Sequence, residues 1–154
     1  MILALDTATP ATVVGVAAPD GTLLAARRHD PAAGEKPGHT TQLLPLAHAA
    51  LTEAGASWSD LTRIGAGVGP GTFTGIRIGV ATARALAQGL DVETVALSTL
   101  HALALGAVRG NGPVLAILDA RRGEAYLAAY DPAGAQVLAP SAWGPERLVE
   151  VPAL

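Results

Sequence analysis

The sequence predicts a mixed α/β protein built from two lobes, and three observations support this class. Short apolar runs rich in β-branched residues alternate with longer segments of helical periodicity. Residues 110–113, Gly-Asn-Gly-Pro, form the clearest break in the chain. A strand–Asp–strand–turn–strand pattern occurs twice, first from Ile2 and again from Val114, which indicates an internal duplication. We therefore expect a first lobe over residues 1–109 and a partial second lobe over residues 114–154.

The strands and helices are expected in an order that begins with a three-stranded antiparallel meander. The expected strands are residues 2–5, 12–17, 22–27, 63–68, 92–97, 114–118, 125–130 and 136–138. The expected helices are residues 39–54, 74–88 and 99–108, with another beginning at Pro145. Proline is tolerated only near a helix start, so Pro45 predicts that Thr40 or Thr41 is the N-cap of the first helix. Gly89 is the expected end of the second helix.

Composition excludes several classes of protein. Half of the residues are hydrophobic, 15% are charged, and the mean hydropathy is +0.38, which rules out an intrinsically disordered chain. A net charge of −3 argues against a free-standing nucleic-acid binder, although a basic partner could supply contacts to RNA. The absence of cysteine excludes disulfides, thiolate zinc sites and cysteine nucleophiles. Neither a signal peptide nor a membrane span is evident, so a cytoplasmic protein is expected.

The most distinctive segment is the glycine-rich stretch 65–79, which joins a strand to a helix. Such a loop can present backbone N–H groups to an anion. It lacks the Gly-Lys-Ser/Thr of a Walker A loop, and Thr72 stands where a dinucleotide fingerprint needs glycine. Two interpretations remain open, a tight turn and a nucleotide or phosphate contact made by Asp6, Gly69, Gly71 and Thr72. Asp6 and its counterpart Asp119 could likewise position a phosphate or a metal, or could cap a turn.

Two rows of side chains on the expected helices are candidates for a partner interface. Small residues recur every four positions at Gly75, Gly79, Ala83 and Ala87, and such a ridge lets another backbone approach closely. The ridge could pack on this chain's own sheet or on a partner. The helix 39–54 offers a second row, and both helices are expected to lie side by side on one sheet. That row is Leu43, Leu46 and Ala50.

The sequence shows no catalytic or metal-binding set. The four histidines have no HxxxH or HExxH spacing, and structural or solvated roles are expected for them. Serine is scarce, and no Ser-His-Asp arrangement can be proposed from spacing. We therefore expect no metal and no cofactor.

Three segments together resemble the bacterial TsaB (YeaZ) family of tRNA threonylcarbamoyladenosine biosynthesis. They are Ile-Leu-Ala-Leu-Asp-Thr-Ala-Thr at 2–9, Gly-Pro-Gly-Thr-Phe-Thr-Gly-Ile-Arg-Ile-Gly at 69–79, and Leu-Asp-Ala-Arg-Arg-Gly-Glu-Ala-Tyr at 118–126. Thr72 stands where the family usually has serine, which keeps the hydroxyl. Family members commonly exceed two hundred residues, so we expect either a naturally short form or a truncated second lobe.

The resemblance implies an actin/hexokinase/Hsp70-like fold with duplicated lobes on mixed sheets. It also implies a non-catalytic subunit that pairs with the catalytic TsaD and works with the ATPase TsaE, with tRNA contacted only indirectly. Alone, such a subunit is expected to form a homodimer through the helix face described above. Two alternatives stay open: a small-molecule phosphotransferase or ATPase that uses Asp6 and Asp119 with Mg²⁺, and a plain homodimeric scaffold.

Overall fold

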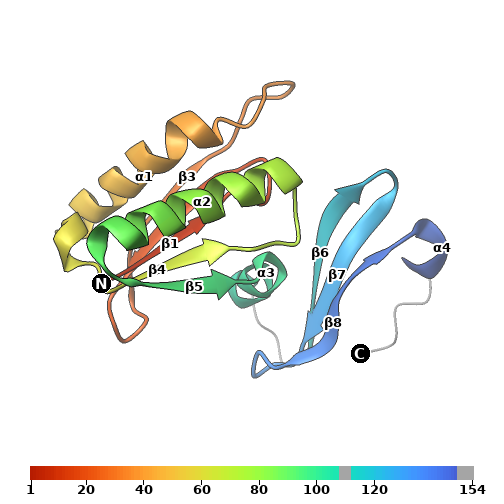
Figure 1. Cartoon of the computed structure of the whole chain (residues 1–154). Coiled ribbons are helices and arrows are strands. Elements are labelled where there is room, and N and C mark those ends of the chain that lie inside the picture. Colours follow the sequence, from red (N-terminus) through yellow and green to blue (C-terminus); the bar gives the residue numbers. More distant parts are fainter. Residues whose placement is uncertain (108–111, 149–154) are drawn as a thin grey trace. The chain divides into compact units, whose positions relative to one another are not determined.

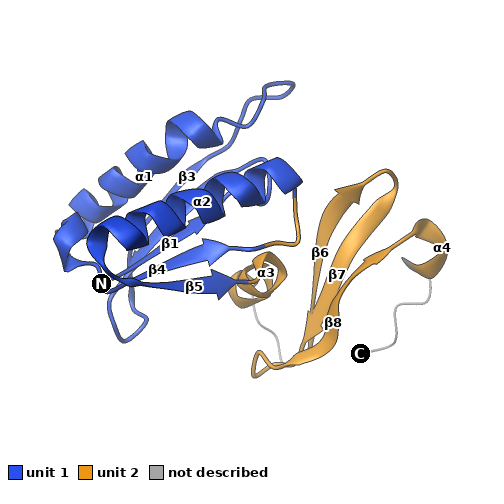
Figure 2. Cartoon of the chain, in the orientation of Figure 1, with its two compact units in different colours: residues 1–68, 72–97 blue, residues 69–71, 98–154 orange. Residues whose placement is uncertain are grey.

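The computed structural model describes residues 1–107 and 112–148, and these fall into two compact units. The first unit comprises residues 1–68 and 72–97, and the second comprises residues 69–71 and 98–154 (Figure 2). Among the described residues, no helix is long and apolar enough to cross a membrane.

The first unit is built on a five-stranded mixed sheet (Figure 1). In spatial order its strands are β3 (Leu23–His29), β2 (Thr12–Ala17), β1 (Ile2–Asp6), β4 (Arg63–Gly67) and β5 (Glu93–Leu97). The first three strands form the expected antiparallel meander, because short turns join them. Strands β1, β4 and β5 are parallel; one helix leads from β3 to β4, and a second makes the crossover from β4 to β5. The five-stranded mixed sheet confirms the α/β class.

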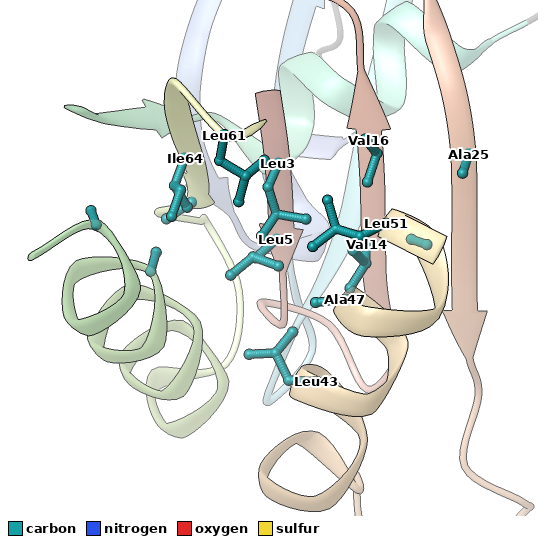
Figure 3. Packing of buried hydrophobic residues seen from close by; sticks show 14 residues of the cluster. Leu3, Leu5, Val14, Val16, Ala25, Leu43, Ala47, Leu51, Leu61 and Ile64 are labelled. Atoms are coloured by element: carbon teal, nitrogen blue, oxygen red, sulfur yellow. The ribbon is translucent and has the colours of Figure 1, made fainter. Parts of the chain in front are cut away.

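Two helices lie side by side on one face of this sheet, as expected (Figure 1). Helix α1 (His39–Glu53) packs on β2 and β3, and helix α2 (Phe73–Leu90) packs mainly on β4. The buried positions of each helix recur every three or four residues, which places them on one side. Figure 3 shows the resulting aliphatic core, whose largest buried residues are Leu3, Leu5, Val14, Val16, Leu43, Leu51 and Ile64.

The N-cap of the first helix and both ends of the second differ from the expected ones. Helix α1 begins at His39 after Gly38, so Thr40 and Thr41 are helical rather than capping residues, and Pro45 lies inside the helix. The missing Pro45 N–H removes one hydrogen bond, which the buried face of the helix offsets. Helix α2 continues through Gly89 to Leu90, and Asp91 adopts the left-handed conformation that ends it, with φ of 55°.

The second unit contains a three-stranded antiparallel sheet. Its strands are β6 (Val114–Arg121), β7 (Glu124–Tyr130) and β8 (Gln136–Trp143), flanked by helices α3 (Thr99–Gly106) and α4 (Pro145–Leu148). Strand β8 is five residues longer than expected, and Pro140 is tolerated because β8 is an edge strand. Ser98 caps α3, since its Oγ accepts a hydrogen bond from the His101 N–H at 3.3 Å. The expected end of this helix, Val108, lies outside the described residues.

The division between the units falls earlier than the predicted boundary at residues 110–113. Helix α3 was expected in the first lobe, but it belongs to the second unit. The physical reason is its core, because Leu100 and Ala104 pack with Ala116, Ala128 and Tyr130. The meander β6–β7–β8 repeats the antiparallel meander β1–β2–β3, as the duplicated sequence pattern predicted.

Candidate functional site

The ridge of small residues on α2 faces the core of the first unit. Gly75, Gly79, Ala83 and Ala87 are all buried, and Ala83 is 0% exposed. The Thr7 hydroxyl donates to the Gly75 carbonyl at 2.7 Å, which ties α2 to the end of β1. A Cβ on Gly75 would collide with the Thr7 carbonyl, and one on Gly79 would lie 2.5 Å from Thr7 Oγ1. The prediction that this ridge is open to a partner is therefore wrong, because the ridge packs on its own sheet.

The predicted row on α1 is mostly buried as well. Leu43 and Ala50 belong to the core, whereas Leu46 is half-buried and packs against its rim. The apolar surface that remains on these helices lies elsewhere. Leu44 of α1 is 48% exposed, and Phe73 at the start of α2 is 73% exposed.

The outer side of α2 carries side chains that the sequence analysis did not single out. Phe73 is held by Arg77, whose guanidinium carbon lies 4.5 Å from the ring centre. Ala81 and Ala85 follow along the same helix and are exposed. Their spacing of four residues was visible in the sequence, but a helix rich in small residues shows that spacing on more than one side. We call Leu44, Phe73, Arg77, Ala81 and Ala85 the outer helix face.

Asp6 closes a turn at the end of β1. Its Oδ1 accepts a hydrogen bond from the Ala8 N–H at 2.7 Å, and the Ala8 carbonyl accepts one from the Thr72 N–H at 2.7 Å. The structure thus brings Asp6 and Thr72 to the same edge of the sheet. Asp119 repeats this arrangement in the second unit, where its Oδ1 accepts from the Arg121 N–H at 2.7 Å. Both aspartates therefore act as turn caps.

The remaining two residues of the predicted phosphate contact, Gly69 and Gly71, belong to the second unit. Gly69 has φ of 98°, a backbone conformation that favours glycine, and its carbonyl accepts from the Thr99 N–H at 2.9 Å. A phosphate contact by the four residues stays a prediction.

His39 is a buried polar residue whose importance the sequence did not reveal. It is 4% exposed, and its Nδ1 lies 2.8 Å from the hydroxyl of Thr12 on β2. Burial lowers the pKa of His39, the carboxylate of Asp6 opposes this effect, and His29 adds to the lowering. The Nε2 atom is buried without a hydrogen-bond partner. The ring is therefore held neutral near pH 7, and its Nδ1 is hydrogen-bonded to Thr12 on β2.

No metal centre is formed by the residues that the structure describes. Within residues 1–107 and 112–148, no group of three or more His, Asp or Glu side chains could hold a metal ion. His39 contacts the Thr12 hydroxyl instead, and the carboxylate of Asp6 acts on it electrostatically.

Comparison with known proteins assigns the family. The family model described as TsaD: tRNA N6-adenosine threonylcarbamoyltransferase matches residues 32–153. The tRNA threonylcarbamoyladenosine biosynthesis protein TsaB of Escherichia coli K12 is 44% identical over 131 residues, which cover 84% of this chain and 54% of that protein. The chain belongs to the TsaB (YeaZ) family. The TsaB of Bacillus subtilis 168 is 38% identical over 95 residues, 62% of this chain and 42% of that protein.

Solved structures of the TsaB (YeaZ) family support the same assignment. YeaZ from Pseudomonas aeruginosa superimposes with a TM-score of 0.77 at 36% identity, covering 92% of this chain and 65% of that one. A second structure is described as an uncharacterized protein with similarity to peptidase YEAZ from Pseudomonas aeruginosa. It superimposes with a TM-score of 0.81 at 36% identity, covering 95% of this chain and 67% of that one. The expected actin/hexokinase/Hsp70-like α/β fold is thereby confirmed. The chain spans about half the length of the curated TsaB relatives that it matches.

Proposed function

We propose that this chain is a non-catalytic subunit of tRNA threonylcarbamoyladenosine biosynthesis that pairs with a TsaD-type catalytic protein. The observation that carries the proposal is its 44% identity to a protein named for this pathway, the TsaB of Escherichia coli. In this role the chain works with a TsaE-type ATPase in the cytoplasm, and it contacts tRNA only through its partners. Its net charge of −3 supports an indirect role with RNA.

The outer helix face is the proposed partner surface. It replaces the buried ridge as the part of α1 and α2 that a neighbour could reach. Phe73 is its expected anchor, because a large, exposed side chain held by Arg77 loses little conformational freedom on binding. Burying an exposed phenylalanine contributes about 1.5–3 kcal/mol. Ala81 and Ala85 would let a partner helix approach closely. In the absence of a TsaD-type protein, this face is proposed to pair two copies of the chain.

A reconstituted modification reaction tests the role. The chain is mixed with TsaD-type and TsaE-type proteins, the enzyme that makes threonylcarbamoyl adenylate, tRNA, threonine, bicarbonate and ATP. We expect modified adenosine only when the chain and the TsaD-type protein are both present. Modification that does not depend on the chain would refute the proposal. Modification without the TsaD-type protein would refute the non-catalytic role, and ATP hydrolysis by the chain alone would favour the phosphotransferase alternative.

Co-elution with the TsaD-type protein tests the surface. Phe73→Ala is expected to weaken co-elution, because it removes the anchor. Leu23→Ala is the matched control, since Leu23 is 65% exposed but lies on β3 rather than on the outer helix face. Equal co-elution of both variants would place the partner surface elsewhere.

A further inference from the structure

A cleft in the first unit lies where helices α1 and α2 begin. The two helices start at the same end of the sheet (Figure 1). The cleft has a volume of about 280 Å³. We call it the α1–α2 cleft, and its lining residues are Lys36, Pro37, His39, Thr72, Thr74, Gly75 and Ile78. Of the residues in the phosphate contact predicted from the sequence, only Thr72 lines this cleft.

Both helix N-termini at the cleft lack an acidic or capping side chain. The N-cap residues are Gly38 for α1 and Thr72 for α2, and neither makes a side-chain hydrogen bond to its helix. The first turn of each helix contains no Asp or Glu. The first N–H groups of a helix have no partner within it, and they carry the positive end of the helix dipole. An anion in the cleft would therefore meet two positive helix ends whose own first turns contain no carboxylate.

Two side chains in the cleft can also donate to an anion. Lys36 is the only lysine in the chain, and its ammonium forms no ion pair within the described part of the chain. His39 is nearly fully buried, and its Nδ1 is engaged by the Thr12 hydroxyl, so Nε2 is the ring nitrogen left for a ligand. When the Thr12 hydroxyl donates to Nδ1, the neutral ring carries its proton on Nε2.

Two carboxylates close to the lining residues, Asp6 in space and Glu35 in sequence, accept hydrogen bonds from backbone N–H groups. Asp6, which interacts electrostatically with His39, accepts a hydrogen bond from the Ala8 N–H. Glu35 precedes Lys36, and it accepts from the Ala32 N–H at 3.4 Å. None of the seven lining residues is acidic. Lys36 is therefore the only lining residue that carries a full charge, and the carboxylate of Asp6 lies outside the lining.

We infer that the α1–α2 cleft binds a small phosphate monoester. The phosphate would lie at the two helix N-termini, within reach of Lys36 and the Thr74 hydroxyl, while Pro37 and Ile78 would contact the organic part. The volume supports this size of ligand. Inorganic phosphate alone would leave much of about 280 Å³ unfilled, whereas pockets for drug-sized ligands begin at roughly 300 Å³.

Titration of the purified chain at constant ionic strength tests the inference. The probes are glycerol 3-phosphate, inorganic phosphate and acetate, followed by amide NMR shifts and by the melting temperature. We expect saturable shifts at residues 36–41 and 72–76 with glycerol 3-phosphate, weaker binding of inorganic phosphate, and no saturation with acetate. The absence of saturable shifts at millimolar glycerol 3-phosphate, or equal binding of acetate, would overturn the inference.

Two variants separate binding from folding. Lys36→Ala should weaken glycerol 3-phosphate binding about tenfold, because it removes a charged hydrogen bond. Arg84→Ala is the matched control, since it removes one exposed positive charge on α2 outside this cleft. Thr74→Glu places a carboxylate at the α2 N-terminus, so it should raise the melting temperature while abolishing binding. Binding that survives both Lys36→Ala and Thr74→Glu would place the ligand elsewhere and refute the cleft.

Discussion

Replacing Gly79 with alanine tests how closely α2 approaches the end of β1. Alanine in place of glycine inside a helix normally stabilises it by about 1 kcal/mol. At Gly79, however, the new Cβ would lie 2.5 Å from Thr7 Oγ1, and the next atoms of Thr7 are its Cβ at 3.7 Å and its backbone nitrogen at 3.8 Å. The hydroxyl would have to move away from the Gly75 carbonyl, to which it donates at 2.7 Å.

The magnitude follows from these two opposing effects. Loss of a buried hydrogen bond costs about 1–3 kcal/mol, and overpacking costs a similar amount. After the gain in helix propensity, Gly79→Ala should lower the free energy of unfolding by about 1–5 kcal/mol. Gly89→Ala is the control in the same helix, because a methyl group there would meet no atom within 4 Å beyond the helix's own backbone. This control should raise stability by up to about 1 kcal/mol.

Urea unfolding followed by circular dichroism measures both variants. A double-mutant cycle with Thr7→Ala isolates the clash, since removing the hydroxyl makes room for the methyl group. We expect the double variant to be less destabilised than the sum of the single variants. If Gly79→Ala is as stable as Gly89→Ala, the close approach of α2 to Thr7 does not exist in solution.

Three further predictions concern the same unit. Ala83→Arg should unfold the first unit, since it buries a charge at a 0% exposed position and costs at least about 3 kcal/mol. Ala81 is exposed, so Ala81→Arg should change stability by less than about 0.5 kcal/mol but weaken partner binding. Thermal melting and co-elution check both variants, and a stable Ala83→Arg protein would contradict the assignment of Ala83 to the core. The lowered pKa of His39 means that the unfolded state takes up the proton first. The free energy of unfolding should therefore fall as pH drops below 6.5, by at most about 1.4 kcal/mol per pH unit, and His39→Asn should reduce this slope in urea titrations. We expect two copies of the chain to associate through the outer helix face, so light scattering at micromolar concentration should show a dimer or larger species. A monodisperse particle of 15.4 kDa would contradict this self-association.

Much of the fold was predictable because hydrophobic periodicity and turn residues agree in most segments. The meander, the two crossover helices and the second meander all follow from these local signals. The N-cap of α1 and the end of α2 were not predictable, because Pro45 and Gly89 each cost a helix only a limited amount that tertiary packing can offset. Asp91, rather than a glycine, takes the left-handed conformation after α2.

The candidate site was harder to predict, for a geometric reason. Periodicity correctly placed Gly75, Gly79, Ala83 and Ala87 on one side of a helix, but it does not say which neighbour that side meets. The α1–α2 cleft combines Lys36 and His39 with Thr74, and Thr74 follows them by more than thirty residues in the sequence. No local pattern links such segments before the fold brings them together.

The contact between Thr7 and α2 also affects how the glycine motif should be used to classify sequences. Gly75 and Gly79 are required because a side chain there would enter space that Thr7 occupies, whatever reaction the protein takes part in. A search that detects these glycines therefore detects a helix lying unusually close to a strand end. Catalytic and accessory proteins that share this packing would carry the same motif. Assigning an enzymatic activity to a chain of this kind thus requires evidence from the reacting groups themselves.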